Sequence, residues 1–363
     1  MAYKNTTVYF MSGTGNSYRV SKWVGEIAKK NGSNTEVHSA MNNEPVTKIK
    51  HGNDNIIGII FPTHGFTMPW HILKFIWRLP CKKSTHAFCI ATRGSLKFGQ
   101  VFIPGMSGSG TFIISLILRL KGYKVRGVMS VNMPSNWFSL HPIQRIESQE
   151  AIIARAQHKV KDFIDKIYLK GKVWFTLNNL YEIFGGILLS LISIGYLFIG
   201  RFFLAKLFFA NMNCNGCGVC AENCSFAAIK MWGKKKLKPF WKYSCESCMR
   251  CAAICPENAI EVGQSWGVVL YFITTIPVSF YIFSTIDVFI PGITNLRGSW
   301  IQVVFDILCW YPAIFISYYI FYFLIRIPVI NRIFTYTTMT HFFFWGRYRE
   351  SNTKLRQIYE KKR

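Results

Sequence analysis

The stretch T-V-Y-F-M-S-G-T-G-N-S, residues 7–17, decides the fold of the first half of the chain. The alternating apolar run Val8–Met11 predicts a strand, and the small polar residues of Ser12–Ser17 predict a loop. Ser17–Lys30 then carry apolar residues at helical spacing. This order places backbone N–H groups at a helix N-terminus, where they form a site for an anion. A plain turn between strand and helix is the alternative.

Further strands and helices follow along the chain. Near-continuous apolar runs at Asn55–Phe61, His86–Ala91 and Val125–Val131 predict buried parallel strands, and Gly110–Leu120 predicts a helix. Strands that alternate with helices predict a doubly wound parallel α/β sheet. Ligands of such a sheet bind beyond the carboxyl ends of its strands. The loops expected at that edge are 12–17, 62–69, 92–99 and 132–137.

The chemistry of the first loop narrows the ligand. No lysine follows Gly15, so the loop is not the phosphate loop of nucleoside triphosphatases. A loop without positive charge suits a terminal phosphate monoester that is held by many hydrogen bonds. Flavin mononucleotide (FMN) carries such a group.

Residues 1–170 resemble the flavodoxins, whose phosphate loop takes the position of the S-x-T-G-x-S at residues 12–17. The resemblance implies FMN as cofactor, with the loops 62–68 and 92–99 around its isoalloxazine ring and His64 or Phe66 near the ring face. A solvent-facing His64, and a Phe66 that packs within its own loop, are the alternatives. The predicted cofactor-binding residues are Ser12, Thr14, Gly15, Asn16, Ser17, Pro62, Thr63, His64, Gly65, Phe66, Thr92, Arg93 and Gly94.

Eight of the eleven cysteines lie in two runs of the form C-x2-C-x2-C-x3-C. We expect no signal peptide, and clustered cysteines in a cytosolic setting indicate metal rather than disulfides. In such runs three cysteines wrap one iron–sulfur cubane and the fourth reaches the other cluster. Zinc is the alternative, but zinc modules use cysteine pairs separated by a longer span. We expect two [4Fe–4S] clusters, held by Cys214, Cys217, Cys220 and Cys255, and by Cys245, Cys248, Cys251 and Cys224.

Residues 211–263 resemble the small α+β ferredoxins of bacteria that carry two clusters. Ser225 replaces the proline expected after the fourth cysteine, and a basic insertion, Lys230–Lys242, separates the runs. Neither departure removes a ligand. The insertion is interpreted either as a solvated hairpin or as a site for an acidic partner or lipid headgroups. The two domains together resemble the fused flavodoxin–ferredoxin proteins, and that resemblance leaves the apolar segments unexplained.

The composition points to a membrane. Half of the residues are hydrophobic, and the net charge is +26, with basic residues beside the apolar stretches. Gly267–Phe289 and Trp300–Ile325 are each long enough to cross a hydrocarbon core of ~30 Å, which predicts a helical transmembrane hairpin over 264–326. The basic, aromatic tail 327–363 and the redox domains would then face the cytoplasm in a multi-pass protein of the cell membrane. No motif indicates nucleic acid as a partner.

The segment 171–210 is harder to interpret. Its uncharged part, 183–199, is 17 residues long and contains glycines. A single crossing here would place the two redox domains on opposite sides of the bilayer, too far apart for electron exchange. We therefore expect an interfacial or re-entrant segment, with a true crossing as the alternative.

These expectations lead to a function. FMN takes one or two electrons and a cubane passes one, so we expect a membrane-anchored oxidoreductase that relays electrons between FMN and two [4Fe–4S] clusters. Its partners would be membrane lipid, a soluble low-potential electron donor or acceptor, and a membrane acceptor or partner reductase. The alternatives are an enzyme that reduces a quinone or unsaturated lipid at its flavin, and a membrane redox sensor. The sequence indicates no catalytic residue.

Overall fold

The computed structural model describes residues 3–41, 52–81, 84–233, 236–275, 278–292 and 299–348. The chain divides into two compact units, which are described separately. Unit 1 contains residues 1–198, 248–253 and 346–363, and unit 2 contains residues 199–247 and 254–345.

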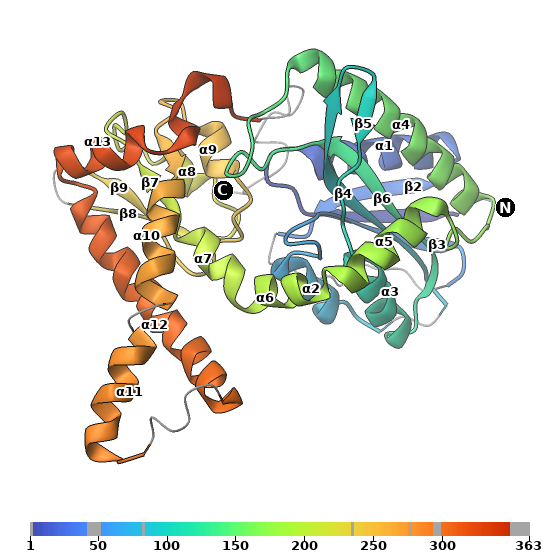
Figure 1. The fold of residues 1–363 in the computed structure, drawn as a ribbon. Helices are drawn as coiled ribbons and strands as arrows, with labels where there is room; N and C mark the ends of the chain where they lie inside the picture. Colours follow the sequence, from blue (N-terminus) through green and yellow to red (C-terminus); the bar gives the residue numbers. More distant parts are fainter. Residues whose placement is uncertain are drawn as a thin grey trace. The chain divides into compact units, whose positions relative to one another are not determined.

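A parallel sheet forms the centre of unit 1 (Figure 1). Its parallel strands lie in the order β2-β1-β3-β4-β6, and β5 pairs antiparallel with the end of β4. This is the flavodoxin-like order of a doubly wound sheet, so the α/β fold predicted for the first domain is confirmed. The strands are β1 (Asn5–Phe10), β2 (Asn34–Ser39), β3 (Asn55–Pro62), β4 (His86–Phe98), β5 (Val101–Ile103) and β6 (Lys124–Pro134).

Helices cover both faces of the sheet. In Figure 1, α1 (Asn16–Lys30) and α4 (Ile146–Tyr168) lie together on one face, and α2 (Trp70–Arg78) and α3 (Gly110–Leu120) lie on the other. Strands β3 and β4 are buried along most of their length, which is why their sequences are almost continuously apolar. The predicted helix 110–120 coincides with α3.

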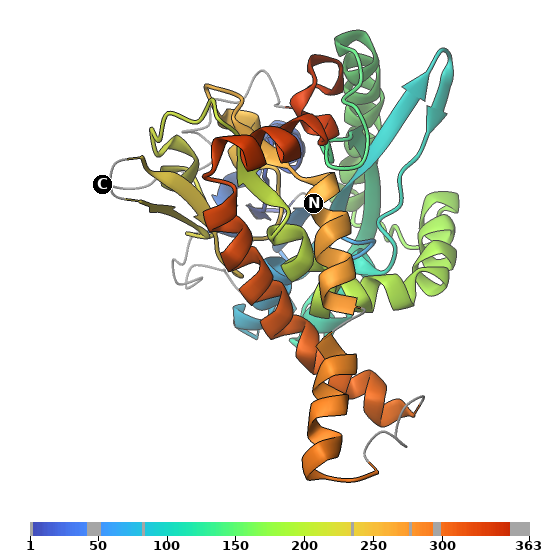
Figure 2. The same cartoon turned by 60° about the vertical axis from the view of Figure 1, so that its left-hand side comes forward.

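One expected loop is a strand. The residues 92–99 continue β4, and they form a hairpin with β5 that extends beyond the rest of the sheet (Figure 2). Leu96 faces Ile103 and Phe98 faces Val101, so apolar cross-strand pairs stabilise the hairpin. Gly99 supplies the positive φ of 56° at the turn. The expectation of a loop over 92–99 was therefore wrong, because we stopped the strand at Ala91, and flavin binding by these residues stays a prediction.

The segment expected to be interfacial or re-entrant begins with a helix that packs on unit 1. Gly185 and Gly186 lie against the loop before α3, where an added Cβ would come within 2.1 Å of Met106 Sδ and 2.9 Å of the Ser109 nitrogen. These glycines permit close packing of the helix. The next helical stretch, Ser190–Ala205, is bent by 71° from it. The elements are α5 (Leu177–Leu188), α6 (Ser190–Gly195), η1 (Tyr196–Gly200) and α7 (Arg201–Ala205).

Short strands and helices follow in an order that repeats. Along the chain they read β7-α8-β8 and then β9-α9-β10. β7 pairs antiparallel with β10, and β8 pairs antiparallel with β9. The elements are β7 (Phe208–Ala210), α8 (Val219–Glu222), β8 (Ile229–Trp232), β9 (Lys238–Trp241), α9 (Arg250–Ile254) and β10 (Ile260–Val262).

The remaining helices belong to unit 2. The stretch predicted as a first span coincides with α10 (Gln264–Thr275) and α11 (Val278–Phe289), and residues 276–277 lie outside the described part of the chain. Among the described residues, α12 (Trp300–Leu324) is the one unbent helix that is long and apolar enough to cross a membrane, by length and composition alone. A helix with these properties also occurs in the cores of proteins that lie in no membrane.

The second half of α12 packs on the small strands. The hydroxyl of Tyr318 donates to the carbonyl oxygen of Phe208 (3.1 Å), and that of Tyr322 donates to the carbonyl oxygen of Trp232 (3.0 Å). The first half of α12 extends with α11 away from the rest of unit 2 (Figures 1 and 2). Because α12 is the one unbent helix of the described residues that meets the length and composition test, the expected multi-pass arrangement is not supported.

The expected tail, 327–363, begins with α13 (Pro328–Tyr336), which packs on unit 2. Asn331 donates through Nδ2 to the carbonyl oxygen of Ala210 (3.1 Å). Thr340 Oγ1 donates to Glu261 Oε2 (2.6 Å), and His341 Nδ1 lies 3.5 Å from Glu261 Oε1. The residues from 349 onward lie outside the described part of the chain.

Candidate functional site

A small hollow in unit 1 lies at the carboxyl ends of β1, β3 and β4. Its volume is about 40 Å³, which is enough for a group of the size of a phosphate but too small for a flavin ring. Gly15, His64, Gly65 and Phe66 of the predicted set are not among its lining residues. The predicted residues that line it are Ser12, Thr14, Asn16, Ser17, Pro62, Thr63, Thr92, Arg93 and Gly94.

The loop before α1 has the conformation of an anion site. Gly15 takes a φ of 114°, which favours glycine, and its N–H donates to Ser12 Oγ (3.1 Å). No side chain caps the N-terminus of α1. The N–H groups of the first turn of α1 have no carbonyl partner within the helix, and the helix dipole adds partial positive charge there. The loop therefore offers backbone donors to a phosphate without any lysine.

Side chains from neighbouring strands hold this loop in place. Ser17 Oγ lies 2.8 Å from Thr92 Oγ1, and Asn136 Nδ2 donates to Thr14 Oγ1 (2.7 Å). Asn16 Nδ2 donates to the carbonyl oxygen of Pro134 (2.8 Å). The end of β6 thus forms a wall of the hollow, a role that we did not assign from the sequence. The expected position of the loop 132–137 at this edge of the sheet was the available signal.

The loop after β3 carries buried polar atoms that lack partners. Thr63 Oγ1 and His64 Nδ1 are buried and make no hydrogen bond with any described residue. Burial lowers the pKa of His64 to about 4, so the ring is neutral at physiological pH. Because buried polar atoms are normally paired, these two suit the ring nitrogens and oxygens of a bound flavin.

Tyr196 covers the same loop. Gly65 and Phe66 take positive φ angles of 55° and 60°. A Cβ on Gly65 would lie 2.1 Å from Tyr196 Cγ, and the Tyr196 ring meets the His64 ring edge to face at 6.4 Å. This side of the loop therefore faces protein, and a flavin ring would need the loop to move.

Arg93 lines the hollow, but its guanidinium is engaged elsewhere. It is buried and forms an ion pair with the buried Glu182 of α5. It also donates to Asn132 Oδ1 (2.6 Å) and Asn178 Oδ1 (2.8 Å). Arg93 therefore attaches α5 to the sheet, although we had expected it to bind the cofactor. Glu182 was missed, and its only signal was a single carboxylate in an apolar helix.

The C-terminal part of the chain supplies a residue that no local pattern indicates. The hydroxyl of Tyr348 donates to Asn16 Oδ1 (2.6 Å), next to the phosphate loop. Tyr348 is buried, and burial raises its pKa, which the charge of Arg19 partly opposes. The two partners are more than 300 residues apart in the sequence, so neither spacing nor periodicity could have paired them.

The first predicted cysteine set lies in unit 2. Burial, together with the smaller effects of the thiols of Cys214, Cys255 and Cys217, raises the pKa of Cys220 to about 12. Each of these three must lie near Cys220 for its charge to act in this way. The four cysteines assigned to one cluster from their spacing therefore influence one another electrostatically.

The two cysteine runs also share one backbone conformation. The second run repeats the first 31 positions later, as Cys245 repeats Cys214. The backbone N–H of Ala228 donates to Cys224 Sγ (3.3 Å), and that of Ala259 donates to Cys255 Sγ (3.3 Å). The left-handed residues repeat at the same interval, although four of the six are not glycine: Gly216, Gly218 and Ala227 in the first run, and Ser247, Met249 and Asn258 in the second. Such strained conformations concentrate at functional sites.

No group of three or more His, Cys, Asp or Glu side chains in the described ranges converges to hold a single metal ion. A cubane contains four irons, each bound to its own thiolate, so its ligands lie farther apart than those of one ion. The two cluster sets stay predictions.

Neither a protein-family model nor a curated protein matches the chain. Among solved structures, a flavodoxin from Streptococcus pneumoniae TIGR4 is 12% identical, with a TM-score of 0.32 over 46% of this chain and 98% of that chain. Flavodoxin 1 from Bacillus cereus is 14% identical, with a TM-score of 0.31 over 46% and 97%. The flavodiiron core of Flv1 from Synechocystis is 14% identical, with a TM-score of 0.29 over 46% and 37%. At these scores the likeness adds nothing to the strand order described above.

Proposed function

We propose that the chain is a membrane-associated oxidoreductase that relays electrons between FMN and two [4Fe–4S] clusters. The observation that carries the proposal is the repeat of cysteines, left-handed residues and N–H···S bonds at an interval of 31 positions. Zinc sites do not require three closely spaced cysteines and a distant fourth in each run. Two-cluster ferredoxin loops do require them.

The phosphate loop supports FMN as the second cofactor. Ser12, Thr14 and the N–H groups that open α1 would hold the phosphate, and Thr63 and His64 would pair with the ring. When bound, FMN supplies a centre that exchanges one or two electrons. The loop 12–17 would hold the phosphate with hydrogen bonds, and it contains no lysine. The 40 Å³ hollow fits the phosphate. The ring would require the loop 62–68 to move away from Tyr196.

Hydrogen bonds around the cysteine runs suit iron–sulfur clusters. The N–H groups of Ala228 and Ala259 donate to thiolate sulfurs, and such bonds raise the reduction potential of a cluster. Lys238 donates to the carbonyl oxygens of Asn211 (3.0 Å) and Cys214 (3.2 Å). This lysine of the basic insertion therefore supports the first cysteine run and is not free to dock a partner.

The test is a cofactor count on the full chain, purified anaerobically in detergent. We expect about eight irons and one FMN per chain from the ligand count. Cys220→Ala should remove roughly four irons, whereas Cys81→Ala, which changes an exposed cysteine outside both runs, should remove none. Electron paramagnetic resonance during reductive titration should show two coupled clusters. Zinc in place of iron, or equal iron in the two variants, would contradict the proposal.

A further inference from the structure

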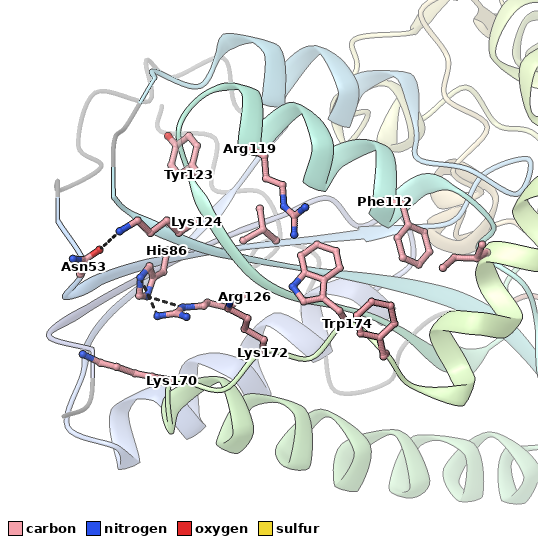
Figure 3. A pocket seen from close by; sticks show the side chains of 13 residues that line it. Asn53, His86, Phe112, Arg119, Tyr123, Lys124, Arg126, Lys170, Lys172 and Trp174 are labelled. Atoms are coloured by element: carbon pink, nitrogen blue, oxygen red, sulfur yellow. Dashed lines mark hydrogen bonds between the residues drawn. The ribbon is translucent and has the colours of Figure 1, made fainter.

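Figure 3 shows a second cavity of unit 1, of about 820 Å³. It lies at the end of the sheet where β4 and β6 begin. His86 begins β4 and Lys124 begins β6, and both residues line this cavity. Because the strands are parallel, the carboxyl ends that form the phosphate loop are at the other edge. The cavity is therefore separate from the proposed cofactor site, and nothing in the proposed electron relay uses it.

The lining is strongly positive. It includes five cationic side chains, and none of the residues that line it is acidic. Across the described part of the chain, no ion pair with a carboxylate joins any of the five. Concave sites lined by charge of one sign concentrate ions of the opposite sign. The five are Arg119, Lys124, Arg126, Lys170 and Lys172.

His86 lies among these cations and is neutral. Burial, together with the smaller effects of the charges of Arg126, Lys124 and Lys170, lowers its pKa to about 4. Arg126 donates through Nε to His86 Nδ1 (3.2 Å), and the hydroxyl of Tyr3 lies 2.8 Å from the same nitrogen. The charge of the cavity is therefore carried by arginine and lysine alone and does not depend on pH near neutrality.

The sheet holds several of these side chains in position. Val173 extends the sheet beside β6, because its N–H donates to the carbonyl oxygen of Arg126 (2.9 Å) and its own carbonyl accepts from Val128 (3.1 Å). Lys172 and Trp174 flank Val173 and share one face of this short extension. The guanidinium of Arg119 stacks on the Trp174 ring at 4.3 Å, as Figure 3 shows. Arginine held in this way loses little entropy when it binds an anion.

One margin of the cavity is apolar and continues along α5. Phe175 and Ile183 line the cavity. Beyond them α5 presents an unbroken face of large exposed side chains, while its other face is attached to the sheet through Glu182. Exposed apolar faces of this size on a fixed helix mark contact surfaces. The exposed residues of the face include Leu177, Leu180, Phe184, Ile187 and Leu188.

We propose that this cavity binds the phosphate headgroup of an anionic phospholipid while the apolar face of α5 lies in the bilayer surface. The cations recognise the negative headgroup, and Phe175 leads from the headgroup to the acyl chains. A free phosphate would use the same cations but would leave the apolar face of α5 without a role. Amphipathic helices with basic neighbours bind anionic membrane surfaces in this way.

The test uses the full chain in an uncharged detergent and measures binding by calorimetry. The probes are dihexanoyl phosphatidylglycerol, dihexanoyl phosphatidylcholine and inorganic phosphate. The variant Arg119→Gln/Lys172→Gln removes two charges from the cavity. The control, Lys29→Gln/Lys30→Gln, removes two exposed charges from the end of α1. The variant Arg119→Lys/Lys172→Arg keeps both charges. A loss of lipid affinity in this variant would come from changed packing of the side chains and not from lost charge.

We expect phosphatidylglycerol to bind more tightly than either other probe. Its affinity should fall roughly 30-fold in the cavity variant, because each of the two lost cations contributes about 1 kcal/mol of attraction to an anionic headgroup. The affinity should stay unchanged in the control. The charge-keeping variant should retain most of the affinity. Equal binding of phosphatidylcholine, phosphate binding as tight as that of phosphatidylglycerol, or wild-type affinity in the cavity variant would each overturn the proposal. Cofactor content stays the same in every variant, so this result is distinct from the test of the electron relay.

Discussion

Replacing Glu182 with leucine should strongly destabilise unit 1. The carboxylate is fully buried, pairs with the buried Arg93, and accepts hydrogen bonds from the N–H groups of Ser107 (2.8 Å) and Gly108 (2.6 Å). Leucine would leave a buried positive charge without its partner, which costs about 3–5 kcal/mol. Two backbone donors also lose their acceptor, so we expect the upper end of this range.

The assay is hydrogen exchange followed by mass spectrometry on the full chain, read at the amides of β4 and β6. The matched control is Glu26→Leu, which changes an exposed glutamate on α1 and should alter the free energy of opening by no more than about 0.5 kcal/mol. The double variant Arg93→Leu/Glu182→Leu should recover part of the loss, because it removes both charges. A loss below about 1 kcal/mol in Glu182→Leu would refute the attachment of α5 to the sheet.

Three further predictions follow from local geometry. Gly15→Ala should cost about 1–3 kcal/mol in thermal unfolding, because alanine disfavours a φ of 114°. His86 is buried and its pKa is lowered to about 4, so only the unfolded chain binds its proton between pH 6.5 and 4. As the pH drops through this window, the free energy of unfolding should fall by about 2–3 kcal/mol, and it should fall by less in His86→Gln. Glu261→Ala should cost about 2–3 kcal/mol, measured by exchange at the amides of β7 and β10, because the buried carboxylate accepts from Thr340 and Asn211.

The sequence predicted those elements of unit 1 whose patterns are local. The periodicity of Ser17–Lys30 and Gly110–Leu120 follows from the faces that α1 and α3 bury, and the apolar run Asn55–Phe61 follows from a strand that is covered on both faces. The hairpin of β4 and β5 escaped prediction because the polar residues Thr92 and Arg93 interrupt the apolar run. Both are buried, but each is paired with a partner distant in the sequence, Ser17 and Glu182.

The cysteine runs show what spacing alone can and cannot give. Their spacing grouped Cys214, Cys217, Cys220 and Cys255, and the charges of the other three act on the pKa of Cys220, but the cluster that they would hold stays a prediction. The interval of 31 positions was also visible in the sequence. The left-handed backbone at Met249, by contrast, was not, because nothing in its side chain favours a positive φ. A residue of this kind takes that conformation only where the surrounding structure imposes it.

The contacts of α5 also bear on whether residues 177–205 cross a membrane. A crossing helix must satisfy its polar side chains within the bilayer, either against other helices or in a water-filled space. In α5 the polar side chains are satisfied by the sheet instead: Asn179 donates to the carbonyl oxygen of Val128 (3.1 Å), and Glu182 pairs with Arg93. Moving α5 into hydrocarbon would break these contacts and leave Arg93 buried without its partner. Attachment to the sheet and crossing therefore exclude each other, and the free energy lost in Glu182→Leu is also a measure of what a crossing of α5 would have to overcome.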